Sequence, residues 1–317
     1  MESLPCVPVP PSSPSSQDSG VTVARLSYHG WPNSYVVANG IMEAIVVPSI
    51  GRVMQLRRAG QTDGMFWENR ALYGQLHDAA PSEWINFGGD KCWPAPQSGW
   101  PERQGRAWPP PAAFDARPLQ AVVADSGVTL ASPLDPDYGI AFVRRVELDP
   151  RAPIMRIRTE FHKILGAPVR VAVWTITQMR DPERIFVLLP ETTKFAQGYV
   201  RLIKTEPADL RTEGRMLSLS RNPRADAKIG TEANSLLWVG PSAAVRIDIE
   251  HAPGEYPDGG CVTEVYTSPD PLPYVELETM SPLADMRAGD CITHTTVYTL
   301  MPRSAVDPES EARKIFR

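Results

Sequence analysis

The sequence lacks the features of a helical, membrane-spanning or nucleic-acid-binding protein. It holds 33 prolines and 22 glycines in 317 residues, and both residue types disfavour the interior of a helix. No apolar run is long enough for a membrane-spanning helix. The formal net charge is −5, with Lys and Arg scattered among the acids. Because no basic stripe is present, we expect no nucleic-acid partner and no membrane partner.

Cysteine and histidine are also scarce. The four cysteines have no CxxC or zinc-finger spacing, and the five histidines show no grouping that suggests a metal site. We therefore expect free thiols and no metal ion. The N-terminus lacks the basic start and apolar region of a secretory signal, which predicts a cytoplasmic protein. P-loop, dinucleotide and nucleophile-elbow motifs are absent, so we expect no cofactor.

What the sequence does contain is a series of short strand-like runs bounded by turn residues. Residues 1–20 are rich in Pro and Ser and predict a disordered tail. Residues 21–303 predict one all-β sandwich domain of roughly sixteen to twenty strands. Residues 304–317 predict a short C-terminal helix or tail, because Asp307 followed by Pro308 is typical of a capped helix start.

The alternation of apolar and polar residues is clearest in two of these runs. In Ile154–Lys163, apolar side chains and Thr159 alternate with charged ones, and Ala243–Glu250 repeats the pattern. This period of two predicts strands with one buried and one solvated face. Asn39 and Gly40 lie between two further runs and predict a hairpin with a type I′ turn.

A long segment without this alternation is rich in tryptophan. Six of the eight tryptophans lie between Trp31 and Trp108, and residues 83–97 mix aromatic rings with Asn, Asp, Lys and Gln. This mixture fits a carbohydrate site, where a ring supports the apolar face of a sugar and polar groups bind its hydroxyls. The alternatives are a core plug under a proline-stiffened loop and, for Asp90 and Lys91, a structural ion pair.

Near the C-terminus, the run Tyr274–Thr279 contains two carboxylates. Period two places Glu276 and Glu278 on one face of a strand, with Cα atoms roughly 6.5–7 Å apart. Two like charges this close raise one pKa, so that one group can give a proton and the other take one. The alternative is an ordinary acidic pair on a solvent-facing strand.

Two segments together resemble the galactose-mutarotase-like (aldose 1-epimerase) superfamily. Residues 37–56 resemble its opening hairpins, in which an Asn-Gly turn, a strand, a glycine and a second strand follow one another. Residues 275–300 resemble its Leu-Glu-Thr strand, the following Ala-Gly-Asp turn and the final strand. The resemblance implies a β-supersandwich of large antiparallel sheets with an open cleft for a sugar.

The resemblance also implies a reaction, mutarotation by a glutamate base and a histidine acid without metal or nucleotide. The glutamate of Leu-Glu-Thr is Glu278 in this sequence. The acid histidine is expected near 169–179, where the sequence has Trp174 and Gln178 but no His. The acid could then be His162, Lys91, Asp90 or Glu276. The residues expected to bind the ligand are Arg52, Asn86, Asp90, Lys91, Trp93, Gln97, Trp174 and Gln178.

The sequence thus predicts a metal-independent isomerase that acts on a sugar or a related polyhydroxylated metabolite. Three alternatives stay open: a non-catalytic carbohydrate-binding protein, a glycoside-cleaving enzyme, and a cyclase or isomerase recruited to the same fold. Glycoside cleavage is disfavoured because glutamates on one strand seldom straddle a bond. The expected partner is a small sugar-like molecule, and the protein is expected to be a monomer or a homodimer.

Overall fold

A computed structural model describes residues 20–77 and 83–317, which form two large antiparallel sheets. The expected tail at residues 1–20 lies outside the described residues except for Gly20. The first sheet has eleven strands. In spatial order these are β1 (Thr22–Tyr28), β2 (Trp31–Ala38), β3 (Met42–Val47), β4 (Arg52–Arg58), β5 (Asp90–Ala95), β10 (Val169–Arg180), β19 (Tyr274–Met280), β18 (Thr263–Thr267), β15 (Ala227–Thr231) and β12 (Val200–Arg201), with β20 (Ala284–Met286) beside β10.

The second sheet has ten strands, and short helices lie around the two sheets. Its order is β13 (Ala208–Glu213), β14 (Met216–Ser220), β11 (Arg184–Leu188), β16 (Ser235–Val239), β17 (Ala243–Ile249), β21 (Cys291–Pro302), β9 (Ile154–Lys163), β8 (Ile140–Leu148), β7 (Gly127–Ala131) and β6 (Gln120–Ala124). The α-helices are α1 (Trp100–Gln104), α2 (Ala112–Asp115), α3 (Pro257–Gly260) and α4 (Pro308–Ile315). The prediction of an all-β sandwich is confirmed.

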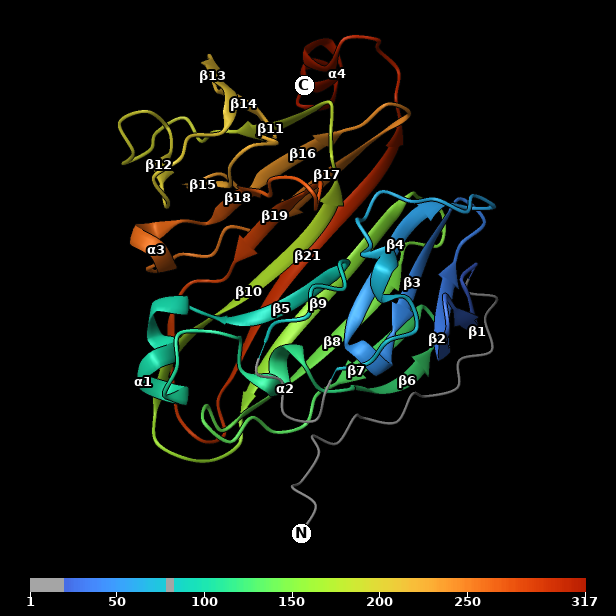
Figure 1. The fold of residues 1–317 in the computed structure, drawn as a ribbon, viewed down its shortest axis with the longest axis vertical. Helices are drawn as coiled ribbons and strands as arrows, with labels where there is room; N and C mark the ends of the chain where they lie inside the picture. The colour runs from blue at the N-terminus through green and yellow to red at the C-terminus, as the bar shows by residue number, and fades with distance from the viewer. Residues whose placement is uncertain (1–19, 78–82) are drawn as a thin grey trace.

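Figure 1 shows β10 and β21 running along most of the molecule, with α4 at one end and α1 towards the other. The strands form where the sequence alternates. In β9, Met155, Ile157 and Phe161 are buried in the core while Arg156 and Arg158 are exposed. The largest apolar cluster fills the space between the sheets, because each sheet must bury its apolar face against another layer. In α4 the Asp307 side chain accepts a hydrogen bond from the Ser310 backbone N–H at 2.8 Å and caps the helix.

The tryptophan-rich segment contains a strand that alternation does not predict. β5 lies between β4 and β10 in the middle of the first sheet, although it contains Pro94. β4 pairs with β5 at one position only, Val53 opposite Asp90. The proline is therefore tolerated, because β4 offers no hydrogen-bond partner next to Pro94 that its missing N–H would leave unsatisfied. This strand carries Lys91 and Trp93 into the sheet.

The hairpin at Asn39 and Gly40 is present, but its turn is not of type I′. Ala38 pairs with Glu43, which leaves four residues in the connection, and Asn39 does not have a positive φ. The Asn39 side chain instead accepts hydrogen bonds from the backbone N–H groups of Ile41 and Met42 at 3.0 and 2.9 Å. An Asx turn of this kind satisfies the backbone without a left-handed Asn.

Candidate functional site

The candidate site lies on the outer face of the first sheet, across β5, β10, β19, β18 and β15. The register places Lys91 opposite Ile176, Ile176 opposite Glu278, and Glu278 opposite Glu264. These side chains therefore form one row that crosses four strands. Thr279, on the opposite face of β19, contacts His294 in β21 at 2.8 Å. The row thus points away from the second sheet.

Glu278 is the central carboxylate of the row and is 0% exposed. Its Oε2 accepts hydrogen bonds from Trp174 Nε1–H at 2.7 Å and from the Lys228 ammonium at 2.9 Å. Its Oε1 has no hydrogen-bond partner among the described residues. One oxygen therefore holds the carboxylate in place, and the other is left to accept a proton or a hydrogen bond.

Glu264 faces Glu278 from the neighbouring strand and is 1% exposed. The Lys228 ammonium lies 2.5 Å from Glu264 Oε2 and so bridges the two carboxylates. Burial raises the pKa of Glu264 well above its usual range, and repulsion from Glu278 and Asp258 adds to the rise, against the attraction of Lys228. The same ammonium is held charged, because the two carboxylates outweigh the cost of burial and raise the pKa of Lys228.

Asp258 joins this group from α3, next to the sheet. It has φ 51 and ψ 45, a left-handed conformation, and is followed by Gly259 at φ 76. Burial raises the pKa of Asp258, and repulsion from Glu278 adds to the rise, against the attraction of Lys228. Repulsion between neighbouring carboxyl groups favours the protonated form of one of them. The structure thus places two carboxyl groups with raised pKa values, Glu264 and Asp258, near Glu278.

Lys91 stands at the other end of the row and is 1% exposed. Its ammonium lies 4.9 and 5.5 Å from the ring centres of Trp93 and Trp84, and 3.5 Å from Glu276 Oε1. No described residue accepts a hydrogen bond from it. Burial lowers the pKa of Lys91, an effect that Glu276 opposes.

Glu276 and Gln178 lie on the same face, two residues along their strands from Glu278 and Ile176. They are cross-strand partners, and Gln178 Nε2 donates to Glu276 Oε1 at 2.9 Å. Burial raises the pKa of Glu276, with Lys91 opposing the rise. The Gln178 Oε1 atom is buried and has no partner within residues 20–77 and 83–317.

Five indole rings form an aromatic wall in this region. Trp93 packs edge to face against Trp84, Trp100, Trp108 and Trp174, with ring centres 5.4 to 5.9 Å apart. The Lys91 ammonium lies over the rings of Trp84 and Trp93, and the Lys228 ammonium over that of Trp174. The wall covers the Lys91 end of the row.

Arg52 and Asp115 hold Trp93 in this wall through hydrogen bonds. Arg52 Nη2 and Trp93 Nε1 both donate to Asp115 Oδ1, at 2.6 and 2.9 Å. Of the other residues predicted to bind the ligand, Asn86 is buried, and both polar atoms of its side-chain amide have no hydrogen-bond partner among the described residues. Gln97 is exposed in a 3-10 helix that follows β5.

Two predicted site residues lie elsewhere. Asp90 points into the space between the sheets, where it pairs with Arg144 and accepts hydrogen bonds from Thr177 and Tyr298 at 2.8 Å each. His162 lies in β9 on the outer face of the second sheet, 3.4 Å from Glu160. Because successive residues of a strand face opposite ways, Lys91 reaches the site and Asp90 cannot.

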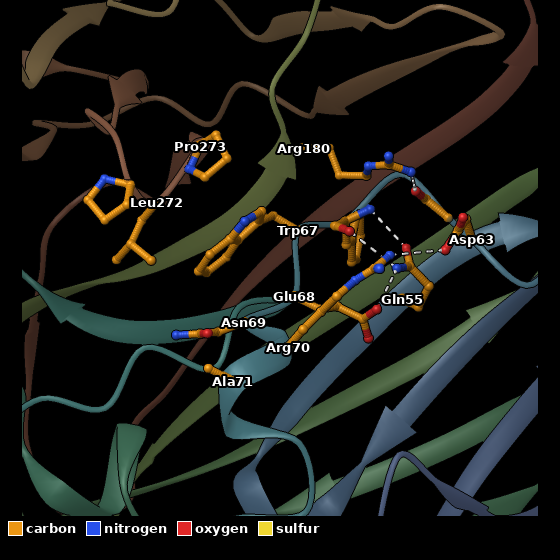
Figure 2. Close-up of a pocket in the computed structure, with 13 residues that line it drawn as sticks. Gln55, Asp63, Trp67, Glu68, Asn69, Arg70, Ala71, Arg180, Leu272 and Pro273 are labelled. Carbon is orange, nitrogen blue, oxygen red and sulfur yellow. Dashed lines mark hydrogen bonds and ion pairs between the residues drawn. The ribbon is translucent and has the colours of Figure 1, made fainter. Parts of the chain in front are cut away.

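Two cavities of about 580 Å³ each are present among the described residues, and neither is lined by Lys91, Ile176, Glu278 or Glu264. Figure 2 shows the first, where Gln55, Glu68 and Arg70 face Arg180 and Pro273 across the opening. Its polar groups already have partners: Glu68 accepts from Tyr28 and Gln55 at 2.7 and 3.2 Å. Asp258 lines the second cavity together with its neighbours in α3.

Sequence reasoning missed Lys228, Glu264 and Asp258. Glu264 and Tyr266 alternate with Val265 in the same way as Glu276 and Glu278 alternate with Leu277, so the run at 262–267 carried a usable signal. Lys228 lies on a short strand, and Asp258 on a turn whose left-handed backbone the sequence shows only as Asp-Gly-Gly. Their meeting depends on the pairing of β15, β18 and β19.

Within the described parts of the chain, no group of three or more His, Cys, Asp and Glu side chains could hold a metal ion. No helix in residues 20–77 and 83–317 is long and apolar enough to cross a membrane.

Comparisons with known proteins identify the fold. No protein-family model and no curated protein matches the sequence. Among solved structures, the Slr1438 protein from Synechocystis sp. PCC 6803 is 11% identical, with a TM-score of 0.54 over 88% of this chain and 100% of that one. Galactose 1-epimerase from Lactobacillus acidophilus NCFM is 10% identical, with a TM-score of 0.52 over 90% of this chain and 99% of that one.

A third solved structure agrees with these two. A galactose mutarotase related enzyme from Lactobacillus acidophilus is 10% identical, with a TM-score of 0.54 over 86% of this chain and 98% of that one. Sequence identities this low establish the fold alone. The chain has the galactose-mutarotase-like fold, as its opening hairpins and its Leu-Glu-Thr strand predicted.

Proposed function

We propose that this protein is an aldose 1-epimerase-like isomerase that opens and closes the ring of a sugar, with Glu278 as the base. The proposal is supported above all by the unpartnered polar atoms on one face of the first sheet. Glu278 Oε1 and Gln178 Oε1 are acceptors, and Lys91 Nζ and Trp84 Nε1 are donors, all buried without a hydrogen-bond partner in the described chain.

Such atoms are costly in a folded protein. Each buried polar group without a partner costs about 1–3 kcal/mol, so a cluster of them marks a place where a ligand supplies the missing bonds. A sugar hydroxyl both donates and accepts, and one sugar can satisfy donors and acceptors together. The neighbouring indole rings suit the apolar face of the same sugar.

The chemistry of ring opening needs one base and one acid. Glu278 takes the proton of the anomeric hydroxyl, and the pair of Glu264 and Asp258 gives a proton to the ring oxygen as the bond from C1 to that oxygen breaks. The product is the open-chain aldehyde. Rotation about the bond from C1 to C2 and the reverse transfers close the ring as the other anomer.

The positions of the groups fit this division of roles. The anomeric oxygen and the ring oxygen are both bonded to C1, and cross-strand partners such as Glu278 and Glu264 have Cβ atoms about 4.5–5.5 Å apart. Lys228 pairs with both carboxylates, and burial favours the protonated form of Glu264. The expected histidine acid is thereby replaced by a carboxyl group.

A second candidate function is carbohydrate binding without catalysis. None of the five histidines lies on this face: His29 and His77 contact Tyr73 and Phe87, His162 and His294 lie in the second sheet, and His251 stacks on Tyr256. The atoms of the row are also nearly inaccessible, so a ligand reaches them only when the covering groups move.

The test is to measure the exchange between sugar anomers by two-dimensional exchange NMR, with a panel of hexoses and hexuronates. Wild-type protein is expected to accelerate the exchange of at least one sugar. Glu278→Gln keeps the acceptor for Trp174 but removes the base, and is expected to lower the rate by about 100-fold or more while leaving binding in place.

Glu102→Gln, at an exposed position of helix α1, is the matched control and is expected to keep the wild-type rate. Full activity in Glu278→Gln overturns the assignment of the base. Binding without any acceleration by the wild-type protein supports the second candidate instead.

A further inference from the structure

The Lys91 end of the row has a different chemistry from the Glu278 end, and it indicates what kind of sugar fits. We infer that the ligand carries a carboxylate that binds against Lys91, so that the substrate class is a hexuronate or a similar sugar acid. The inference rests on the proposed function for the placement of the sugar ring over Ile176 and Glu278.

Lys91 offers more donors than its surroundings can use. Its ammonium has three N–H groups, and across the described residues none of them finds an acceptor. The nearest carboxylate oxygen, Glu276 Oε1, is 3.5 Å away and already accepts from Gln178. A buried ammonium in this state is matched by an anion.

Further donors stand beside it without partners. Arg52 Nε and Trp84 Nε1 are buried and have no acceptor among residues 20–77 and 83–317. Val53 pairs with Asp90, so Arg52 and Lys91, which adjoin this pair, lie on the same face of neighbouring strands. The remaining guanidinium nitrogens of Arg52 are used by Asp115 and by the carbonyl of Ile50.

Donors and acceptors are therefore separated along the row. Lys91 and its neighbours supply donors at β5, while Glu278 and Glu264 supply carboxyl groups at β19 and β18. Two strand spacings of about 4.8 Å separate Lys91 from Glu278, with Ile176 between them. In a pyranose form of a hexuronate, the carboxylate on C5 and the anomeric carbon both flank the ring oxygen, so the two ends can be engaged together.

The charge at this end favours a carboxylate over a phosphate. Arg52 is neutralised by Asp115 at 2.6 Å, which leaves Lys91 and Glu276, 3.5 Å apart, as the other charged groups at this end. Burial favours the neutral form of both Glu276 and Lys91, and a bound anion restores the charged form of Lys91. A singly charged carboxylate matches one ammonium, whereas a doubly charged phosphate leaves excess negative charge beside Glu276.

The experiment compares binding by isothermal titration calorimetry for three ligand sets: D-glucuronate, D-galacturonate and D-mannuronate; their methyl esters; and the parent hexoses with glucose 6-phosphate. Wild-type protein is expected to bind one hexuronate about tenfold or more tighter than its methyl ester and its parent hexose. Equal affinity for acid and ester overturns the inference, and so does tightest binding of the phosphate.

Lys91→Gln removes the charge and is expected to abolish the preference for the acid over its methyl ester. The exposed Lys204→Gln is the matched control. Equal weakening of acid and hexose contradicts the inference. The comparison of acid with ester uses wild-type protein only, so it decides the question even if Lys91→Gln fails to fold.

Failure of the inference and failure of the proposed function remain distinguishable. Glu278→Gln is expected to lose anomer exchange and to keep the preference for the acid. Exchange of neutral hexoses without any preference for hexuronates refutes the inference alone, and hexuronate binding without exchange refutes the function alone.

Discussion

Glu264 and Glu278 lie directly opposite each other on adjacent strands and share one ammonium, that of Lys228. Two carboxylates and one ammonium leave an excess negative charge in a buried place, which is costly unless one carboxyl group keeps its proton. Glu278 receives two hydrogen bonds on one oxygen, whereas burial and two acidic neighbours raise the pKa of Glu264. The proposed function gives these two groups opposite roles, Glu278 as the base and Glu264 as part of the acid.

Glu264→Gln tests this division. Glutamine resembles the protonated form of Glu264, so the free energy of unfolding at pH 7 is expected to change by less than about 1 kcal/mol. The rate of anomer exchange is expected to fall by about 100-fold or more because the acid is lost. Urea unfolding and exchange NMR measure the two quantities. Wild-type exchange in this variant excludes Glu264 as the acid.

The interior ion pair under the site predicts a large effect on stability. Asp90 pairs with Arg144 between the sheets, and both are fully buried. Asp90→Asn leaves the guanidinium without a counter-charge and is expected to lower the free energy of unfolding by about 3–5 kcal/mol. Thermal and urea unfolding measure it.

Asp285→Asn is the control, because Asp285 is 72% exposed and pairs with Arg170 at the surface. This substitution is expected to cost no more than about 1 kcal/mol. A similar small loss in both variants contradicts the role given to the interior pair.

His294 predicts a dependence of stability on pH. It is buried against Thr279, and burial lowers its pKa to about 4. As the pH falls below about 6.5, the unfolded chain binds a proton at this histidine and the folded chain does not. The contribution of His294 to the free energy of unfolding is therefore fully present above pH 6.5 and is lost as the pH falls towards 4. Between pH 7 and pH 5 the loss is about 2 kcal/mol.

The measurement is urea unfolding of wild type and His294→Gln at pH 7 and pH 5. Carboxyl groups with raised pKa values, such as Glu264, act in the opposite sense, so the difference between the two proteins isolates the histidine. An identical pH dependence in both proteins shows that His294 is not buried in its neutral form.

Much of the fold could be predicted from local pattern. Alternation identified strands such as β9 and β17 because one face of each is buried and the other is not. β5 was not predicted, because all six of its residues are buried, which removes the alternation, and because Pro94 argues against a central strand. The position of β5 depends on its pairing with β10 at six positions and with β4 at one, which the sequence does not show.

The site could be predicted in part. Glu276 and Glu278 share a face, as the period of two requires, and Lys91, Trp93, Trp174 and Gln178 lie on the same side of the sheet. The group around Lys228 was not predictable, because strands separated by about fifty residues bring it together. Asp90 and Lys91 are adjacent in sequence but face opposite sides of the sheet: Asp90 pairs with Arg144 between the sheets, while Lys91 lies in the candidate site.

Two glycines just before β5, Gly88 and Gly89, help to position Lys91. Gly88 has φ +94, and a Cβ atom there would lie 2.2 Å from the backbone oxygen of Trp67. Gly89 follows at φ +72 and donates its N–H to the same oxygen at 2.9 Å. The chain must therefore pass this point without a side chain for β5 to enter the sheet in register.

Gly88→Ala is expected to lower the free energy of unfolding by about 3 kcal/mol, because it combines a left-handed backbone with a collision against backbone atoms. Gly40→Ala separates the two causes: Gly40 has φ +80, but nothing lies within 4 Å of its added Cβ. That variant is expected to lose only about 1 kcal/mol. Urea unfolding compares them, and an equal loss in both shows that close packing at Gly88 does not fix the start of β5.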